Sequence, residues 1–281
     1  MSKSNIHYYI IIFVLYIVIF LTIFYIFKYK MLESMQVGET WFITFGGPSI
    51  NYRDAVKRLT DEVHKTQSFD HIIGYTDEDL KNDPEFWDSH GELAEATTWH
   101  RGGYGYWIWK PYLILKTMQQ MNDNDIVLYM DAGCTIKNND EYKTKYEDMQ
   151  KLINKCAKND ILFTSSDQLE RHYSKMDLVK YLEMDSIDVL NSTQYQATIL
   201  FIKKTEQTHR FVKKWYNIMS NNYELIDGSP SQNFADLKDY KETRNDQSVF
   251  SLLAKKYGID ESCMLPLEKH DPILISRRRS G

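Results

Sequence analysis

Short apolar segments alternate with longer amphipathic segments over most of this chain, and this alternation limits its possible folds more than any other feature. The first two apolar segments are residues 41–45 and 70–76. Between them, Ala55, Val56 and Leu59 recur at helical spacing. A strand, a helix and a strand in this order form a βαβ unit, which predicts a parallel pair of strands.

The alternation continues toward the C-terminus, whereas residues 77–95 look irregular apart from short helical turns at 83–90. Further strands are expected at 126–130, 160–166 and 194–204, and further helices from Lys110 onward and at 143–158, 205–220 and 245–258. We therefore expect an open, mostly parallel α/β sheet with helices on both faces. Ligands of such sheets bind beyond the carboxyl ends of the strands.

The N-terminal segment 8–27 contains no charged residue, glycine or proline and is long enough to cross a bilayer as a helix. It lacks a small-residue cleavage site, and Tyr8 and Tyr25 suit interfacial anchoring. We expect a single-span membrane protein whose orientation stays open, because lysines flank the segment on both sides. The expected parts are a tail at 1–7, a transmembrane anchor at 8–27, a stalk at 28–40 and one domain at 41–281.

Composition narrows the classes of partner. The net charge of −5 argues against nucleic acid, since phosphate binding usually needs a basic excess. Three cysteines are too few and too scattered for a disulfide framework or a zinc cluster. The aromatic content of 14% suits a thick core first, and stacking on sugars or bases second.

Asp131 follows the apolar segment IVLYM directly, so the predicted strand ends at a carboxylate. Asp131-Ala-Gly133 could simply start a tight turn, with the aspartate bonding nearby backbone N–H groups. Alternatively, the carboxylate binds a divalent cation, Mn²⁺ or Mg²⁺, that bridges the phosphates of a nucleotide.

The segment HRGGYGYWIWKP, residues 100–111, precedes this strand and favours the second interpretation. Arg101 and Lys110 could neutralise phosphate, and the glycines allow a ligand to approach the backbone closely. Tyr104 and Tyr106 could stack on a ring. The alternative is that the aromatic residues here only seal the core, and we expect this of at least one tryptophan.

The chain resembles a GT-A-type glycosyltransferase in several segments together: the apolar N-terminus, the βαβ start, RGGYGYWIWKPYLILKTM, DNDIVLYMDAGC and NDQSVFSLL. It is most similar to the small glycosyltransferases related to capsular polysaccharide synthesis and initiating mannosyltransferases of bacteria and large DNA viruses. The resemblance covers roughly residues 40–275. It implies transfer of a sugar, a hexose in the first instance, from a nucleotide-sugar donor to a glycan, protein or lipid acceptor.

The resemblance also implies a metal site, from which this sequence departs. GT-A enzymes hold their cation with an Asp-x-Asp motif; here Asp131 takes the first position and Gly133 the second. Some GT-A enzymes add a ligand from near the C-terminus, which makes His270 the leading second ligand for Mn²⁺ or Mg²⁺. A solvated surface histidine and a site without metal remain alternatives. Arg277, in the terminal arginine run, could cover the donor diphosphate.

Related GT-A folds carry an Asp-Gln pair beside the donor sugar, and Asp246-Gln247 matches it. The expected roles are stabilisation of an oxocarbenium-like state by Asp246 and a bond from Gln247 to a sugar hydroxyl. Asp246 could instead cap the helix that starts there. Further candidates for sugar recognition are Asp167, Gln194 and Gln196.

Other functions stay open. A membrane-tethered, inactive GT-A domain that only binds glycans or nucleotides would explain the missing second aspartate. A sugar-phosphate transferase needs similar residues. A glycoside hydrolase is disfavoured because no close pair of acids at strand ends is evident, and the stereochemical outcome is not fixed by the sequence.

Overall fold

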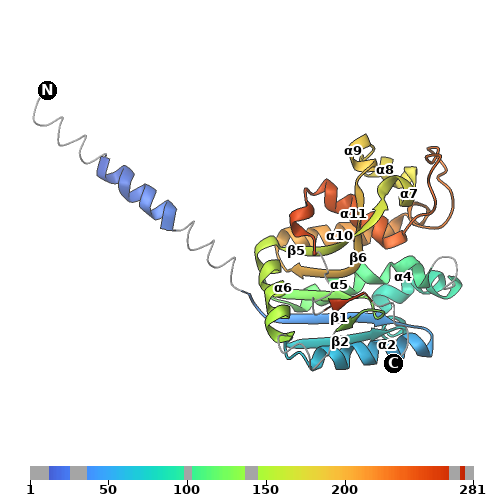
Figure 1. The fold of residues 1–281 in the computed structure, drawn as a ribbon, viewed down its shortest axis with the longest axis horizontal. Helices are drawn as coiled ribbons and strands as arrows, with labels where there is room; N and C mark the ends of the chain where they lie inside the picture. Colours follow the sequence, from blue (N-terminus) through green and yellow to red (C-terminus); the bar gives the residue numbers. More distant parts are fainter. Residues whose placement is uncertain (1–12, 26–36, 98–102, 137–144, 266–272, 276–281) are drawn as a thin grey trace, which may run out of the picture.

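The computed structural model describes residues 13–25, 37–97, 103–136, 145–265 and 273–275. Five strands form the main sheet in the order β2-β1-β3-β6-β5 (Figure 1). Their bounds are β1 Thr40–Gly46, β2 His71–Thr76, β3 Ile126–Met130, β5 Ile161–Leu169 and β6 Thr193–Lys203. β1 pairs in parallel with β2 and β3, whereas β6 runs antiparallel to both of its neighbours. The expected open, mostly parallel sheet is confirmed.

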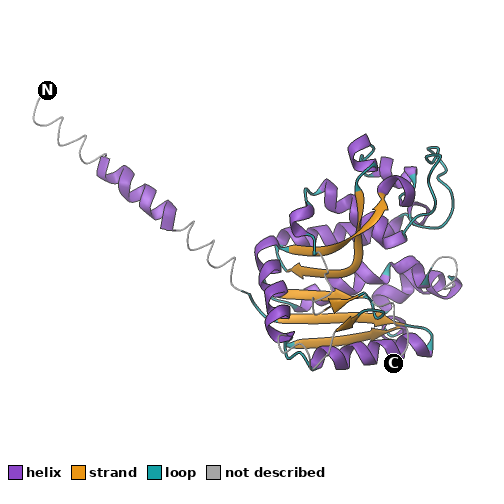
Figure 2. Cartoon of the chain, viewed as in Figure 1, coloured by secondary structure: helices purple, strands orange, loops and turns teal. Residues whose placement is uncertain are grey.

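Helices cover both faces of the sheet, as Figure 2 shows. They are α2 Ile50–His64 and α6 Lys145–Asn159 on one face, and α5 Trp109–Gln120, α10 Glu206–Asn221 and α11 Asn245–Lys256 on the other. The alternation of side chains along each strand produces this arrangement. Phe42 and Leu128 pack with α2 and α6, while Ile43 and Tyr129 pack on the opposite side.

The βαβ unit at the start of the domain is also confirmed. β1, α2 and β2 follow one another, and Ile43 of β1 pairs with Ile73 of β2 in parallel register. Thr40, expected at the end of the stalk, already belongs to β1.

The region between β2 and α5 is more helical than expected. It contains α3 Asp77–Lys81 and α4 Pro84–Ala96. The backbone N–H of Glu85 donates to the Asp83 side chain at 3.2 Å, and proline occupies the first turn of α4. Both are ordinary helix-start signals, which the acidic composition of the segment obscured.

A second, two-stranded sheet pairs β4 Thr135–Ile136 with β7 Ile273–Leu274 in antiparallel fashion. It places a C-terminal strand beside the turn that follows Asp131. The remaining short elements are η1 Tyr104–Trp107, α7 Glu170–Tyr173, α8 Met176–Tyr181, α9 Ile187–Leu190, η2 Tyr223–Leu225 and η3 Glu261–Cys263.

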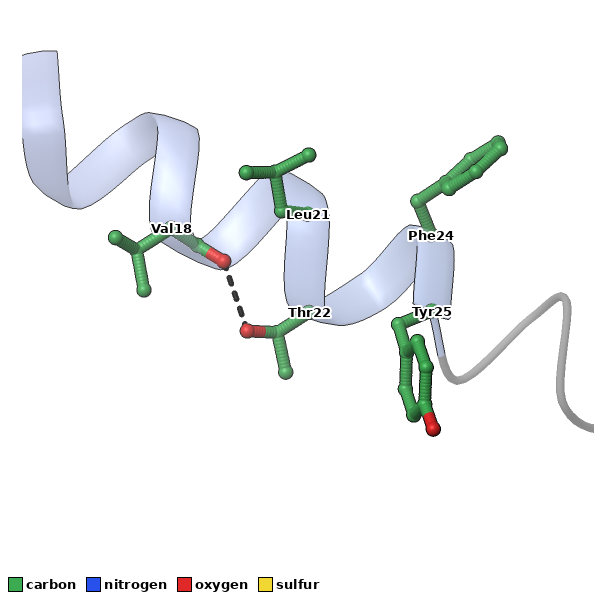
Figure 3. Close-up of a pocket in the computed structure, with 5 residues that line it drawn as sticks. All are labelled: Val18, Leu21, Thr22, Phe24 and Tyr25. Atoms are coloured by element: carbon green, nitrogen blue, oxygen red, sulfur yellow. Dashed lines mark hydrogen bonds between the residues drawn. The ribbon is translucent and has the colours of Figure 1, made fainter.

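Residues 13–25 form a helix whose apolar side chains are exposed. The shallow hollow in Figure 3 is lined by this one helix, and the Thr22 hydroxyl in it donates to Val18 O at 2.8 Å. Within the part of the chain that the structure describes, no helix combines the length and apolarity needed to cross a membrane. The ends of the predicted anchor, 8–12 and 26–27, lie outside the described residues.

Candidate active site

The order of the strands locates the site. β1 is followed in the sequence by β2 on one side of it, and β3 lies on its other side, so the chain order reverses between β1 and β3. Ligands of open α/β sheets bind at such a switch point, beyond the carboxyl ends of the strands. Asp131 directly follows β3 and therefore stands at this place, as expected.

The turn after Asp131 is held by α2. The Cys134 N–H donates to Asp131 O at 2.9 Å, which closes the turn. The Arg58 guanidinium donates to Ala132 O at 2.8 Å and to Cys134 O at 3.0 Å, and it pairs with Glu62 at 2.9 Å. These contacts fix the backbone on which the Asp131 carboxylate is carried.

The side chain of Asp131 turns toward two partners outside its own turn. Its Oδ1 accepts from the Tyr129 hydroxyl at 2.6 Å and lies 3.2 Å from Lys110 Nζ. The side chain is 38% exposed, so it remains accessible to a ligand. The turn itself closes through the Asp131 carbonyl, and among the described residues the carboxylate contacts Tyr129 and Lys110.

Lys110 lies at the first turn of α5 and is buried. Its Nζ is 2.5 Å from Asp246 Oδ2 and donates to Ala197 O at 3.1 Å, in addition to its contact with Asp131. Its ammonium joins two carboxylates, one from a strand end and one from the start of α11. That Lys110 also neutralises phosphate stays a prediction.

Asp246 is only 6% exposed. Burial raises its pKa to about 6, against the opposing effect of the Lys110 ammonium and with a further contribution from the Asp131 charge. Burial by itself lowers the pKa of Lys110, but the two carboxylates outweigh it and raise that pKa above its usual range. The cluster therefore sets two carboxyl groups against a single ammonium.

Residues with left-handed backbone conformations flank this cluster. Gly105, Tyr106 and Trp107 have φ angles of 56°, 47° and 59°, and Asn245, next to Asp246, has a φ of 41°. Such conformations are costly for residues with side chains and concentrate at functional sites. Gly103 is required in the same segment, because a Cβ there would stand 2.0 Å from the Trp107 ring.

The aromatic residues of this segment divide into core and surface. Tyr104 is 3% exposed and stacks on Phe45, so its burial argues against the predicted stacking on a ligand. Trp109 packs 4.0 Å from the same Phe45 and seals the core, as expected of one tryptophan. Tyr106 is only partly buried. Arg101 lies outside the described residues.

The predicted glutamines likewise differ in their burial. Gln247 Nε2 donates to Gln194 Oε1 at 2.6 Å, so the structure brings these two together. Gln194 is fully buried, so it reaches the accessible part of the site through Gln247, and its predicted contact with the sugar stays a prediction. Gln196 accepts from Thr164 Oγ1 at 3.0 Å. Asp167 is exposed but lies inside β5, which extends beyond the strand end expected from the sequence.

The described residues do not form a complete site for a divalent cation. They contain no group of three histidine, cysteine, aspartate or glutamate side chains suited to a metal. Asp131 Oδ1 contacts Tyr129 and Lys110, whereas Oδ2 has no contact with another of the described residues. His270, the predicted second ligand, and Arg277 lie outside the described residues.

Sequence reasoning missed two contributors to the site. Tyr129 lies in the middle of an apolar strand and reads as core, although it stands two residues before Asp131 on the same strand face. Glu170 begins α7 and reads as a helix-start acid, yet it is fully buried against Lys255 at 2.6 Å.

No family model matches the chain, and no curated protein matches it by sequence. A glycosyltransferase involved in glycosylation of the major capsid of PBCV-1 is 8% identical, with a TM-score of 0.37, and the match covers 66% of this chain and 68% of that one. Mouse xyloside xylosyltransferase 1 is 10% identical (TM-score 0.39, 82% and 85% covered). The glycosyltransferase GlyE of Streptococcus pneumoniae TIGR4 is 12% identical (TM-score 0.32, 78% and 44% covered).

Proposed function

We propose that this protein is a glycosyltransferase that moves a sugar from a nucleotide-sugar donor to a glycan, protein or lipid acceptor. The single observation that carries the proposal is the Asp131–Lys110–Asp246 cluster at the switch point of the sheet. It combines a buried carboxylate with a partly exposed one where ligands of such sheets bind.

The cluster suits the charge that develops in sugar transfer. As the bond to the leaving nucleotide breaks, positive charge develops on the sugar ring. Asp246 is ionised at neutral pH, and its charge is screened little because the residue is buried, so it can stabilise that state. Lys110 holds both carboxylates in place, and Asp131 presents its free oxygen to the ligand.

A glycoside hydrolase is the second candidate, because the structure provides the pair of acids that the sequence did not reveal. Asp131 and Asp246 both contact Lys110 Nζ, at 3.2 and 2.5 Å, and must therefore lie close together. Hydrolases use two nearby carboxyl groups. With a pKa of about 6, Asp246 could supply the proton that hydrolysis needs, so product analysis separates the two functions.

Three finer features belong to the proposal. The segment 8–27 tethers the protein to a membrane as a single span. A hexose is the expected donor sugar. Metal use, with Asp131 and His270 as ligands for Mn²⁺ or Mg²⁺, is a separate hypothesis. Its failure would leave the proposed transfer reaction unchanged.

The test uses the full chain in detergent, incubated with a panel of nucleotide sugars and with Mn²⁺, Mg²⁺ or EDTA. Release of a nucleoside diphosphate from one donor, lost in Asp131→Asn and Asp246→Asn, is the expected result. Release of the monophosphate would instead identify a sugar-phosphate transferase. Cleavage of simple glycosides without any nucleotide sugar would identify a hydrolase, and binding without turnover an inactive binding domain. Activity that survives EDTA would remove the metal from the proposal.

A further inference from the structure

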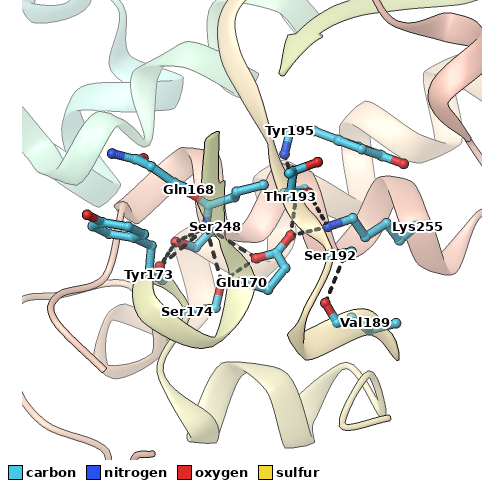
Figure 4. A network of polar contacts seen from close by, with 12 residues as sticks. Gln168, Glu170, Tyr173, Ser174, Val189, Ser192, Thr193, Tyr195, Ser248 and Lys255 are labelled. Atoms are coloured by element: carbon cyan, nitrogen blue, oxygen red, sulfur yellow. Dashed lines mark hydrogen bonds and ion pairs between the residues drawn. The ribbon is translucent and has the colours of Figure 1, made fainter. Parts of the chain in front are cut away.

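A buried polar cluster lies next to the active site, and one of its members, Gln194, contacts Gln247. We define the Glu170 cluster as Glu170, Ser174, Gln194, Ser251 and Lys255, several of which are labelled in Figure 4. Glu170 Oε2 accepts from Ser174 Oγ at 2.7 Å and from Gln194 Nε2 at 3.2 Å. Its Oε1 accepts from Lys255 Nζ at 2.6 Å and from Ser251 Oγ.

This cluster determines which way the Gln194 carboxamide faces. A carboxylate only accepts hydrogen bonds, so Gln194 must turn its NH₂ group toward Glu170. Ser174 and Ser248 impose the same choice. Their hydroxyl protons go to Glu170 and to Tyr173 O, so their oxygens accept from Gln194 Nε2, at 3.2 and 3.3 Å. A reversed amide would place its oxygen against these acceptors.

The orientation of Gln194 in turn fixes Gln247. Because the Nε2 of Gln194 faces the cluster, its Oε1 faces Gln247 and accepts from Gln247 Nε2 at 2.6 Å. The Oε1 of Gln247 must then point away from Gln194. Among the described residues no hydrogen bond reaches this oxygen, and Gln247 is partly exposed beside Asp246.

We infer that Glu170 is a positioning residue that, through Gln194, presents the Gln247 carboxamide oxygen to the bound sugar, so that the site selects a sugar hydroxyl acting as a hydrogen-bond donor. The inference rests on the proposed function. It adds which partner is the donor in one hydrogen bond between the protein and the sugar. Sugars that carry only an acceptor at this position are rejected, because the Gln247 oxygen would face another acceptor.

The substitution Glu170→Gln tests this directly. Gln at position 170 can donate as well as accept, and the Ser174 and Ser248 hydroxyls can rotate to donate to a reversed Gln194, so Gln194 and Gln247 are no longer held in one orientation. Gln194→Met breaks the same relay while leaving Glu170 and Lys255 intact, and serves if E170Q does not fold. Ser174→Ala is the matched control, since it removes one hydrogen bond from the same carboxylate oxygen while Glu170 and Ser248 still accept from Gln194 Nε2 and hold its orientation.

Binding is measured by calorimetry on the full chain in detergent. The probes are UDP-glucose, UDP-galactose and GDP-mannose, each with forms in which one sugar hydroxyl is replaced by fluorine, which accepts but cannot donate. In the wild type, one such replacement weakens binding about tenfold. This difference in affinity between the hydroxyl and the fluorine form disappears in E170Q and Q194M and persists in S174A. An unchanged preference in both relay variants, or an equal loss in S174A, would overturn the inference.

Nuclear magnetic resonance separates this inference from the proposed function. One Gln247 side-chain amide proton, identified by its loss in Gln247→Met, exchanges slowly in the wild type and rapidly in Q194M. If this protection is present but none of the probes binds, the orientation stands and the proposed donors are wrong. If both protons exchange rapidly in the wild type, the orientation is wrong even where a probe binds.

Discussion

Two buried ion pairs lie close together in this molecule and differ in how completely they are satisfied. In the Glu170 cluster, one carboxylate faces one ammonium, and each carboxylate oxygen accepts two hydrogen bonds. At the active site, the Lys110 ammonium faces two carboxylates, and Asp131 remains 38% exposed. The first set matches one acid with one base and is closed, whereas the second sets two acids against one base and is open to a ligand.

This difference distinguishes a supporting cluster from a reactive one. A buried charge is tolerated when it is paired and its hydrogen bonds are made, as for Glu170. A surplus carboxylate with a raised pKa, next to strained backbone at Tyr106 and Asn245, has no evident benefit for stability. Such an arrangement is typical of functional sites. The following predictions test whether the two clusters differ as described.

The largest effect is expected for Lys110→Met. It removes the ammonium shared by Asp131 and Asp246 and leaves Asp246 buried without a cation. Loss of one partner from a buried ion pair costs about 3–5 kcal/mol. Urea unfolding of the full chain in detergent should therefore show a free energy of unfolding lower by this amount.

The double variant Lys110→Met with Asp246→Asn is the control. It removes both buried charges, so it should recover at least about half of the lost stability. A single variant as stable as the wild type would contradict the pairing of Lys110 with Asp246 in the folded protein.

The sequence predicted the strand and helix that carry this site better than the side-chain contacts within it. The apolar segment ending at Asp131 and the helix starting near Asp246 follow from local periodicity, so both carboxylates were found. The burial of Lys110 between them was not predicted, because the contact joins residues far apart in the chain. The Glu170 cluster was missed for the same reason, since it joins α7, β6 and α11. Its serines carried no prediction, and Gln194 was predicted to recognise the sugar.

The next largest effect should appear in catalysis. Asp131→Asn keeps an oxygen for the Tyr129 hydroxyl but removes the partly exposed charge. We expect kcat to fall about 10²-fold, the size of effect seen when one preorganised electrostatic group is lost. Because the side chain is 38% exposed, the free energy of unfolding should change by less than about 1 kcal/mol. A fall in stability matching the fall in activity would indicate a structural role instead.

Lys255→Met should cost less stability than Lys110→Met, about 2 kcal/mol. Glu170 then loses its cation but keeps three neutral donors, from Ser174, Gln194 and Ser251. Desolvation lowers the pKa of Lys255, so part of the cost of burying this ammonium disappears with it. Urea unfolding of the two lysine variants side by side measures the difference. Equal losses would show that the two clusters are satisfied to the same degree.

The smallest effect concerns pH. The pKa of Asp246 is raised from 3.8 to about 6, so this carboxylate loses its charge as the pH falls below 6, and kcat/KM should drop about tenfold between pH 7 and pH 5. Its effect on stability has the opposite sign. The folded state binds this proton more tightly than the unfolded state, so the stabilisation is complete below pH 3.8 and is lost as the pH rises through 6.

Acid inactivation should therefore occur without loss of the Asp246 contribution to stability. The comparison of wild type with Asp246→Asn isolates that contribution in urea unfolding at pH 5 and pH 7. Relative to the variant, the wild type should gain stability at the lower pH while its activity falls. If both quantities decline together, the loss of activity reflects unfolding, and the charge on Asp246 is not what the reaction requires.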